Sequence, residues 1–385
     1  MRHRLRYQLL AFTATRTAIN TLYRMVYPFL PVLARGLGVD LQAMSLALTL
    51  RSLVGASGPF LATVSESRGR KTGMLFGLIL FFVGAILVIA RPVFPVFILA
   101  LILTTLGKYT FDPAMQAYLG DRTPYAQRGR AVAITELSWS LSFLPGALLV
   151  GLLIQNKGWT APFICLATLV GIAFIVLAWM LPRDIIPHDN PPRLAQNLRL
   201  VFTYVPALAG LAVGFSATVA NEVVNLIFGV WMEDSFGLEI AGLGVAAAAI
   251  GLAELCGETL VIFITDRLGK TRAIGIGLAL NSLATLALTF LGKSLPGALL
   301  GLFLFYFTFE FTLVSIIPLM TEVLPSARTT MMAANVTGLS LGRAAGALLA
   351  PSLYGSGILV SGFAAVLFNL LGLFALRLLP SRLRG

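Results

Sequence analysis

The sequence predicts an all-α membrane protein whose chain folds into two pseudo-symmetric six-helix bundles. Three observations predict it. First, 58% of the 385 residues are hydrophobic and only 11% are charged, whereas a soluble domain carries about 25% charged residues. Second, apolar runs recur along the chain, and each is long enough to cross a ~30 Å hydrocarbon layer as a helix. Third, short motifs repeat about 200 residues apart. This composition excludes an ordinary soluble enzyme and a disordered chain.

Twelve membrane spans are expected, with boundaries where apolar stretches meet charged or turn-forming residues. The first apolar stretch follows the basic start MRHRLRYQ, a pattern that signal peptides share. However, this stretch passes Arg16 and continues to Leu33, which is too long for a short cleavable signal. We therefore expect it to be the first membrane helix. The twelve spans are expected at 9–33, 42–64, 72–90, 93–118, 131–154, 160–181, 201–230, 240–265, 273–292, 295–321, 330–354 and 357–376.

The placement of the basic residues predicts the orientation of the chain in the membrane. Nineteen Lys and Arg lie in the termini and the even-numbered connections, four lie in the odd-numbered connections and five lie within spans, which accounts for all 28. Cytoplasmic segments carry such an excess, so both termini are expected in the cytoplasm, beneath a bacterial plasma (inner) membrane. The net charge of +12 then reflects topology, and no nucleic-acid partner is expected.

An internal repeat predicts the domain organisation. The tetrapeptide Gly-Ala-Leu-Leu occurs at 146–149 and again at 346–349, and Leu-Pro occurs at 181–182 and 379–380. These two matches, two stripes of small residues and a loop motif at 66–71 and 266–270 all repeat at nearly the same offset, and four such matches indicate a duplication. We expect an N-terminal bundle at 1–182, a polar, proline-rich cytoplasmic linker at 183–199 and a C-terminal bundle at 200–385. The repeat also matches two stripes of small residues, which favour close helix packing: Ser138, Ser142 and Gly146, and Gly338, Gly342 and Gly346.

Cysteine and histidine offer little chemistry in this chain. Cys165 and Cys256 both fall within expected spans, so they predict neither a disulfide framework nor a metal site. His3 and His188 fall in segments expected on the cytoplasmic side, where a solvated surface role is favoured over a proton relay. No metal and no cofactor is expected.

Eleven ionisable residues lie within the expected spans, and they carry the functional signal. A lone charge at the centre of a bilayer costs about 2.5–3.5 kcal/mol on insertion scales. These residues must therefore face water, pair with each other or lose their charge. The five cations nearly balance the six acids, which indicates a polar interior shared by the two halves. They are Arg16, Arg24, Arg51, Lys108, Arg343, Asp112, Glu136, Glu222, Glu254, Glu258 and Glu310.

Helical spacing groups polar residues into stripes. Residues 16, 20, 24 and 27 share one face of the first span, and Lys108 lies four residues before Asp112, where the two can pair. From these stripes we select candidate substrate and coupling residues, with structural ion pairing as the alternative for each. Glu254 and Glu258 are one turn apart on one helix face, and for both residues a role in gating and a role in coupling are equally favoured. The candidates are Arg24, Lys108, Asp112, Glu136, Glu222, Glu310, Arg343, Asn20, Tyr27 and Asn225.

The twelve spans, the repeat and one loop motif together resemble the major facilitator superfamily. The loop after the second span reads Glu-Ser-Arg-Gly-Arg-Lys at 66–71, and its copy reads Asp-Arg-Leu-Gly-Lys at 266–270. The resemblance implies that spans 1, 4, 7 and 10 line a central cavity. It also implies that two acid–cation sets latch the cytoplasmic face: Glu66, Arg70 and Asp121, and Asp266, Lys270 and Glu322.

The sequence shows no phosphate-binding glycine loop and no nucleophile–base set, so no enzyme activity is expected. We expect a secondary transporter that works by alternating access, with proton-coupled efflux of amphipathic or cationic compounds, closest to the drug/proton antiporter branch. One alternative is transport of organic or lipid-like anions through Arg16, Arg24 and Lys108. Another is a non-transporting receptor. The expected partners are a small-molecule solute, protons and the lipid bilayer, and the chain is expected to be a monomer.

Overall fold

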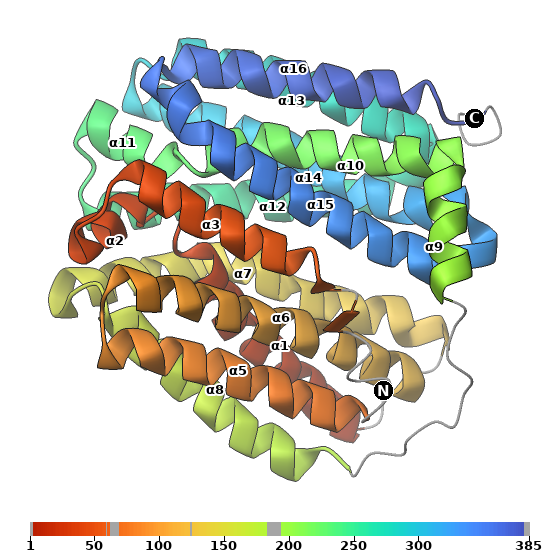
Figure 1. Cartoon of the computed structure of the whole chain (residues 1–385), viewed down its shortest axis with the longest axis horizontal. Coiled ribbons are helices and arrows are strands. Elements are labelled where there is room, and N and C mark those ends of the chain that lie inside the picture. The colour runs from red at the N-terminus through yellow and green to blue at the C-terminus, as the bar shows by residue number, and fades with distance from the viewer. Residues whose placement is uncertain (1–2, 59, 62–68, 124, 183–193, 381–385) are drawn as a thin grey trace. The chain divides into compact units, whose positions relative to one another are not determined.

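The computed structural model describes residues 3–58, 60–61, 69–123, 125–182 and 194–380, and all regular structure in these ranges is helical (Figure 1). Contacts between Cα atoms divide the chain into two compact units. We call residues 1–189 and 238–251 the first unit, and residues 190–237 and 252–385 the second unit. One of the three boundaries between the units therefore falls inside a helix, α12 (Ile240–Leu268).

The described residues of the first unit form seven helices besides the first part of α12. They are α1 (His3–Arg24), α2 (Leu30–Leu37), α3 (Leu41–Gly55), α5 (Arg70–Ala90), α6 (Phe94–Arg122), α7 (Tyr125–Lys157) and α8 (Ala161–Met180). The second unit holds the remaining helices. They are α9 (Leu194–Thr203), α10 (Val205–Asn225), α11 (Phe228–Phe236), the rest of α12 (Ile240–Leu268), α13 (Lys270–Leu291), α14 (Leu295–Val323), the short 3₁₀ turn Pro325–Ala327, α15 (Arg328–Gly355) and α16 (Ile358–Leu376).

Local sequence signals explain where several helices begin and end. Asp40 caps α3, because its Oδ1 accepts a hydrogen bond of 2.8 Å from the Ala43 amide, and Ser294 caps α14 in the same way. Gly38 ends α2 at φ 67° and Gly237 ends α11 at φ 61°. These left-handed positions favour glycine because it has no Cβ atom. The two helix ends occupy matching places in the repeat.

Nine helices in the described ranges are long and apolar enough to cross a membrane. The number becomes ten if α2 and α3, which meet at a bend of 108°, form one span. The chain is thus an integral, multi-pass membrane protein. The helices α1 and α15 are not in this group; α1 carries four arginines, and α15 carries Arg328, Arg343 and many small residues. The count of twelve spans remains a prediction.

Three expected spans differ from the structure. The stretch 9–33 is broken by a turn at 25–29, between α1 and α2, and the stretch 201–230 is broken at 226–227, between α10 and α11. Pro28 explains the first break, because proline has no N–H and clashes with the preceding turn. No proline or glycine marks the second break. The helix α3 ends at Gly55, whereas the expected span continued to 64; residues 62–64 lie outside the described ranges.

The same helix contact is repeated in both units through the small-residue stripes. In the first unit, Gly146 of α7 faces Thr21 of α1, since a Cβ built at Gly146 would lie 2.6 Å from the Thr21 hydroxyl. In the second unit, a Cβ built at Gly346 of α15 would lie 2.9 Å from the Val219 carbonyl of α10. Glycine therefore permits close packing at both sites, as expected for stripes of this kind.

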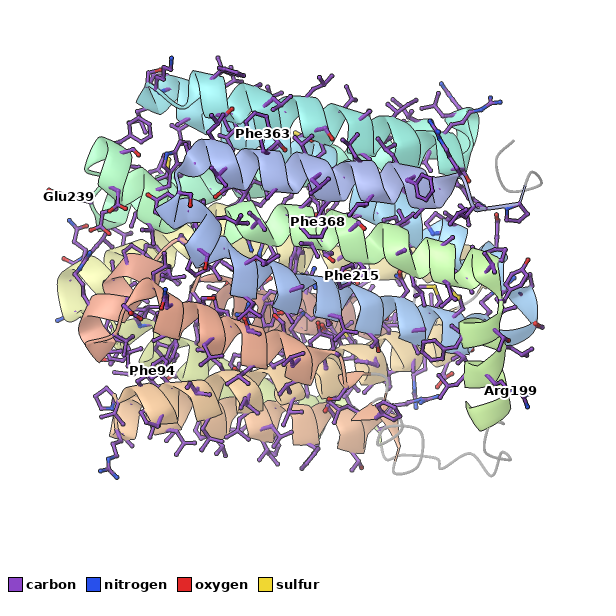
Figure 2. The ribbon with its side chains drawn as sticks, turned by 45° about the horizontal axis from the view of Figure 1, so that its top comes forward. Phe94, Arg199, Phe215, Glu239, Phe363 and Phe368 are labelled. Atoms are coloured by element: carbon purple, nitrogen blue, oxygen red, sulfur yellow. The ribbon has the colours of Figure 1, made fainter. Side chains whose placement is uncertain are left out.

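The outer faces of the described helices carry large apolar side chains. Trp179 of α8 is 92% exposed, and Phe363 of α16, labelled in Figure 2, is 56% exposed. A soluble monomer rarely exposes apolar surface in contiguous patches of this kind. Such side chains match a hydrocarbon solvent, in agreement with the membrane assignment.

Candidate functional site

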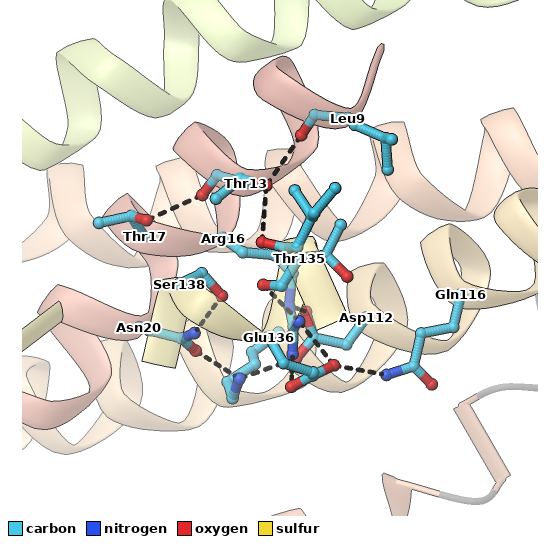
Figure 3. A network of polar contacts seen from close by, with 12 residues as sticks. Leu9, Thr13, Arg16, Thr17, Asn20, Asp112, Gln116, Thr135, Glu136 and Ser138 are labelled. Carbon is cyan, nitrogen blue, oxygen red and sulfur yellow. Dashed lines mark hydrogen bonds and ion pairs between the residues drawn. The ribbon is translucent and has the colours of Figure 1, made fainter. Parts of the chain in front are cut away.

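The first unit contains a buried ion network centred on Arg16 of α1 (Figure 3). Its Nε donates to Asp112 Oδ1 of α6 at 3.0 Å. Its Nη1 and Nη2 donate to the two carboxylate oxygens of Glu136, on α7, at 2.8 and 3.2 Å, and Nη1 also donates to the Thr135 carbonyl. One guanidinium therefore joins three helices with charge-assisted hydrogen bonds, the stronger class of protein hydrogen bond.

Lys108 extends this network along α6. Its Nζ donates to Asp112 Oδ2 at 2.7 Å and to Asn20 Oδ1 at 2.6 Å. The Asn20 side chain then donates to the Ser138 hydroxyl at 3.1 Å. The pairing of Lys108 with Asp112 follows the spacing noted in the sequence. Two cations and two carboxylates are thus brought together, which offsets the cost of removing each charge from water.

Arg24, at the end of α1, lies between two aromatic rings of α7. Its guanidinium carbon is 4.2 Å from the Trp139 ring centroid and 3.6 Å from that of Phe143. Its Nη1 donates to the Trp139 carbonyl at 2.9 Å and to the Ser142 hydroxyl at 3.3 Å. Aromatic faces attract cations electrostatically, so these contacts stabilise a guanidinium that is only 4% exposed.

Arg51 of α3 contacts the break between α1 and α2. Its Nη1 donates to the Tyr23 carbonyl at 2.7 Å, and its Nη2 donates to the Tyr27 hydroxyl at 2.6 Å. Tyr27, one of the candidate residues, therefore bonds to α3. The Arg51 side chain is fully buried.

The second unit places Glu222, Asn225 and Tyr306 in one hydrogen-bonded chain. The Tyr306 hydroxyl of α14 donates to Asn225 Oδ1 at 2.7 Å, and Asn225 Nδ2 donates to Glu222 Oε2 at 3.2 Å. Glu222 is 1% exposed and Glu310, one turn along α14 from Tyr306, is 4% exposed. Both acids have further polar or electrostatic partners. A buried acid is thus joined to Asn225 and Tyr306 just before the break at 226–227.

The remaining ionisable residues of the expected spans lie on α15 and α12. Arg343 is half-buried on α15, between Gly342 and the Gly346 contact with α10. Glu254 is buried on α12 and Glu258 is half-buried one turn later. All three have polar or electrostatic partners.

The structure brings together part of each expected cytoplasmic latch. Arg70 Nε lies 3.4 Å from Asp121 Oδ2, and Lys270 donates to Glu322. Both pairs are largely exposed, so each contributes about 1 kcal/mol or less to stability. The other acids of the two sets, Glu66 and the side chain of Asp266, lie outside the described residues.

Histidine, cysteine and metal chemistry add nothing to the site in the described part of the chain. His188 and the side chain of His3 lie outside it. Cys165 and Cys256 are free and half-buried. Within the searched residues, no group of three or more His, Cys, Asp or Glu could hold a metal ion.

Sequence reasoning did not select three residues that the structure places at the site. Trp139 and Phe143 flank Arg24, and Arg51 bonds to the break in the first span. The first two lie four residues apart and directly follow Ser138 and Ser142 of the small-residue stripe. That position beside a helix contact was the signal available in the sequence.

Comparison with known proteins identifies the class. The model of the Major Facilitator Superfamily matches residues 13–220, more than half of the chain. YbcL of Bacillus subtilis, an uncharacterized MFS-type transporter, is 26% identical over 322 residues, covering 82% of each chain. YceJ of the same organism is 26% identical over 369 residues and covers 93% of each. The inner membrane transport protein YdhP of Escherichia coli is 25% identical over 181 residues, 47% of this chain and 46% of that protein.

Solved structures agree on the fold. A D-xylose–proton symporter superposes with a TM-score of 0.78 at 16% identity, covering 97% of both chains. A bacterial homologue of the human lysosomal transporter Spinster superposes with a TM-score of 0.75 at 14% identity, covering 98% of this chain and 95% of that one. Fold and relatives define a membrane transport protein. The chain belongs to the major facilitator superfamily. It is a secondary transporter of a solute and not an enzyme, and the expected all-α fold is confirmed.

Proposed function

We propose that the protein couples proton movement to the export of amphipathic or cationic compounds by alternating access, as in the drug/proton antiporter branch. It works as a monomer with twelve spans in a bacterial inner membrane and has both termini in the cytoplasm. The observation that carries the proposal is the different arrangement of buried acids in the two units. The relatives are all described as transporters, which gives no support to the receptor alternative.

The acids of the second unit are the proposed proton carriers. Asp112 and Glu136 of the first unit each contact the Arg16 guanidinium, and this pairing compensates their charge in place. Glu222 accepts a hydrogen bond from the Asn225 amide, which Tyr306 holds in turn, and both Glu222 and Glu310 have further polar or electrostatic partners. A buried carboxyl group can gain and lose a proton when its partners change during the transport cycle. We assign the same role to Glu310 because of its burial one turn from Tyr306.

The cations of the first unit favour a second candidate, transport of organic or lipid-like anions. That unit buries four cations, Arg16, Arg24, Arg51 and Lys108, against the two carboxylates of the Arg16 network. Arg16 is already bound to two carboxylates and a carbonyl, and Lys108 to Asp112. In this second candidate we assign binding of the anionic substrate to Arg24, whose guanidinium lies against the Trp139 and Phe143 rings.

Transport by purified protein in liposomes separates these two functions. Under an imposed pH gradient, the proposal expects movement of ethidium, an amphipathic cation, and none of carboxyfluorescein; the second candidate expects the reverse. Glu222→Gln and Glu310→Gln should each abolish the response to the pH gradient while exchange without a gradient continues. Glu239→Gln, the same change at an exposed acid, is the matched control. Gradient-driven movement that survives both buried substitutions overturns the coupling assignment.

A further inference from the structure

Arg51 is a fully buried cation that the transport assignments above do not use. It is the largest side chain in the described residues with essentially no solvent exposure. A buried arginine is costly unless its donors and its charge are both satisfied. Tyr23 and Tyr27 together supply two hydrogen bonds to the Arg51 guanidinium and two aromatic rings beside it. The Nε atom of Arg51 is buried and makes no hydrogen bond within the described residues, so these contacts offset part of the cost of its burial. The two tyrosines lie on either side of the end of α1.

The backbone at this point explains why an arginine is useful there. The Tyr27 amide donates to the Arg24 carbonyl, three residues back, at 3.1 Å. An α-helix would direct that amide to Tyr23, four residues back. The Tyr23 carbonyl instead receives a hydrogen bond from Arg51 Nη1. A positive charge at the C-terminal end of a helix is also favoured by the helix dipole. Arg51 therefore caps α1 from a different helix.

The capped end of α1 carries Arg24 and contacts the ion network. The Tyr23 ring lies 4.1 Å from the Arg51 guanidinium carbon and 5.7 Å from Lys108 Nζ. Arg24 is the next residue along the chain, and its guanidinium lies against Trp139. A substitution at Arg51 is therefore expected to alter the positions of Arg24 and Lys108, because Tyr23 lies next to both. Gly251 stands 200 residues later, so the repeat offers no second copy of this side chain.

We propose that Arg51 is a positioning residue that holds the break between α1 and α2 closed and fixes Arg24 against Trp139 and Phe143. These three groups act as one clamp. The guanidinium of Arg51 donates to the carbonyl of Tyr23 and to the hydroxyl of Tyr27, so the turn between the two tyrosines opens only when these hydrogen bonds break. The role of Arg24 in substrate binding rests on the proposed function, whereas the clamp itself does not.

Cysteine accessibility tests the clamp without any substrate. The reporter is Val26→Cys, a buried position inside the turn, in a background with Cys165→Ser and Cys256→Ala. Labelling by N-ethylmaleimide is measured in membranes, before and after adding Arg51→Lys, which keeps the charge and loses the fork. We expect labelling at least tenfold faster, which corresponds to about 1.4 kcal/mol. Tyr27→Phe removes only one acceptor and should give a smaller increase in the same direction.

Two controls make the outcome decisive. Val170→Cys reports a buried position on α8 of the same unit, and Arg91→Lys repeats the arginine change at an exposed site. Acceleration at Val26 alone supports the clamp. Equal acceleration at Val26 and Val170 means that Arg51 only stabilises the bundle, and unchanged labelling at Val26 means that the turn does not depend on it; either result overturns the proposal. If the unsubstituted protein does not transport ethidium while the labelling at Val26 behaves as expected, the proposed function is overturned and the clamp is not.

Discussion

The Arg16 network permits a quantitative test of how a membrane bundle compensates buried charge. Asp112 contacts both cations of the network, and its side chain is only 16% exposed. Asp112→Asn removes one negative charge while an amide oxygen remains to accept a hydrogen bond. The network then changes from two cations and two acids to two cations and one acid. Breaking a buried pair in this way costs about 3–5 kcal/mol, and we expect a loss of stability in that range.

Two further variants allow the loss of stability of Asp112→Asn to be ranked against others. The Glu136 side chain is 40% exposed, so water screens its charge, and Glu136→Gln should cost about 1 kcal/mol or less. The double variant Asp112→Asn with Lys108→Met leaves one cation and one acid, and should recover more than half of the loss. Asp121→Asn, at a largely exposed acid, is the control and should stay within about 0.5 kcal/mol of the parent.

Unfolding in mixed detergent micelles, followed by helical circular dichroism, measures these differences. The ranking is the central expectation, because it follows from burial and charge balance and does not depend on the absolute scale. If Asp112→Asn costs no more than Glu136→Gln, or if adding Lys108→Met makes the loss larger, the four groups do not share their charge as described here.

Four other variants probe the second unit. Gly346→Leu should lower the free energy of unfolding by about 2 kcal/mol, as overpacking of a core does, because its Cβ would lie 2.7 Å from the Glu222 Cβ. Gly338→Ala, where the nearest atom is 3.7 Å away, should be tolerated when unfolding is measured in the same micelles. Tyr306→Phe should shift the pH dependence of ethidium transport while leaving exchange without a gradient intact, since the Asn225 contact to Glu222 loses its support. Asn369→Leu should lower the melting temperature, because it breaks a buried amide contact between α16 and α13.

The sequence predicted the local features of the site better than the contacts between helices. The pair Lys108–Asp112 follows from a separation of four residues on one helix, and the break near Pro28 has a chemical signal. The contact of Arg16 with Asp112 and Glu136 crosses three helices, and no periodicity within one helix reports which neighbour a side chain meets. Arg16 was therefore assigned to anion binding in one alternative, although its guanidinium is already occupied by carboxylates.

The break at 226–227, between α10 and α11, is a second feature that the sequence did not predict. The amide–phenol contact between Asn225 and Tyr306 lies beside it, and Phe228 packs edge-on against the Tyr306 ring. Tyr306 belongs to α14 and is 81 residues from Asn225 in sequence. A helix end that is set by tertiary contacts leaves no proline, glycine or capping box to read.

The two copies of the small-residue stripe allow one helix contact to be compared in two versions within the same chain. Ser138 and Ser142 bond to Asn20 and Arg24, whereas the matching positions 338 and 342 are glycines. A Cβ built at Gly342 would meet the Thr218 hydroxyl and the Phe215 carbonyl of α10, and one built at Gly338 would lie 3.7 Å from the Leu211 carbonyl. The same helix contact is therefore made by hydrogen-bonding side chains in one half and by glycine in the other. Exchanging serine and glycine between the two copies would change the polarity and the spacing of a single helix contact while lipid, loops and chain length stay constant.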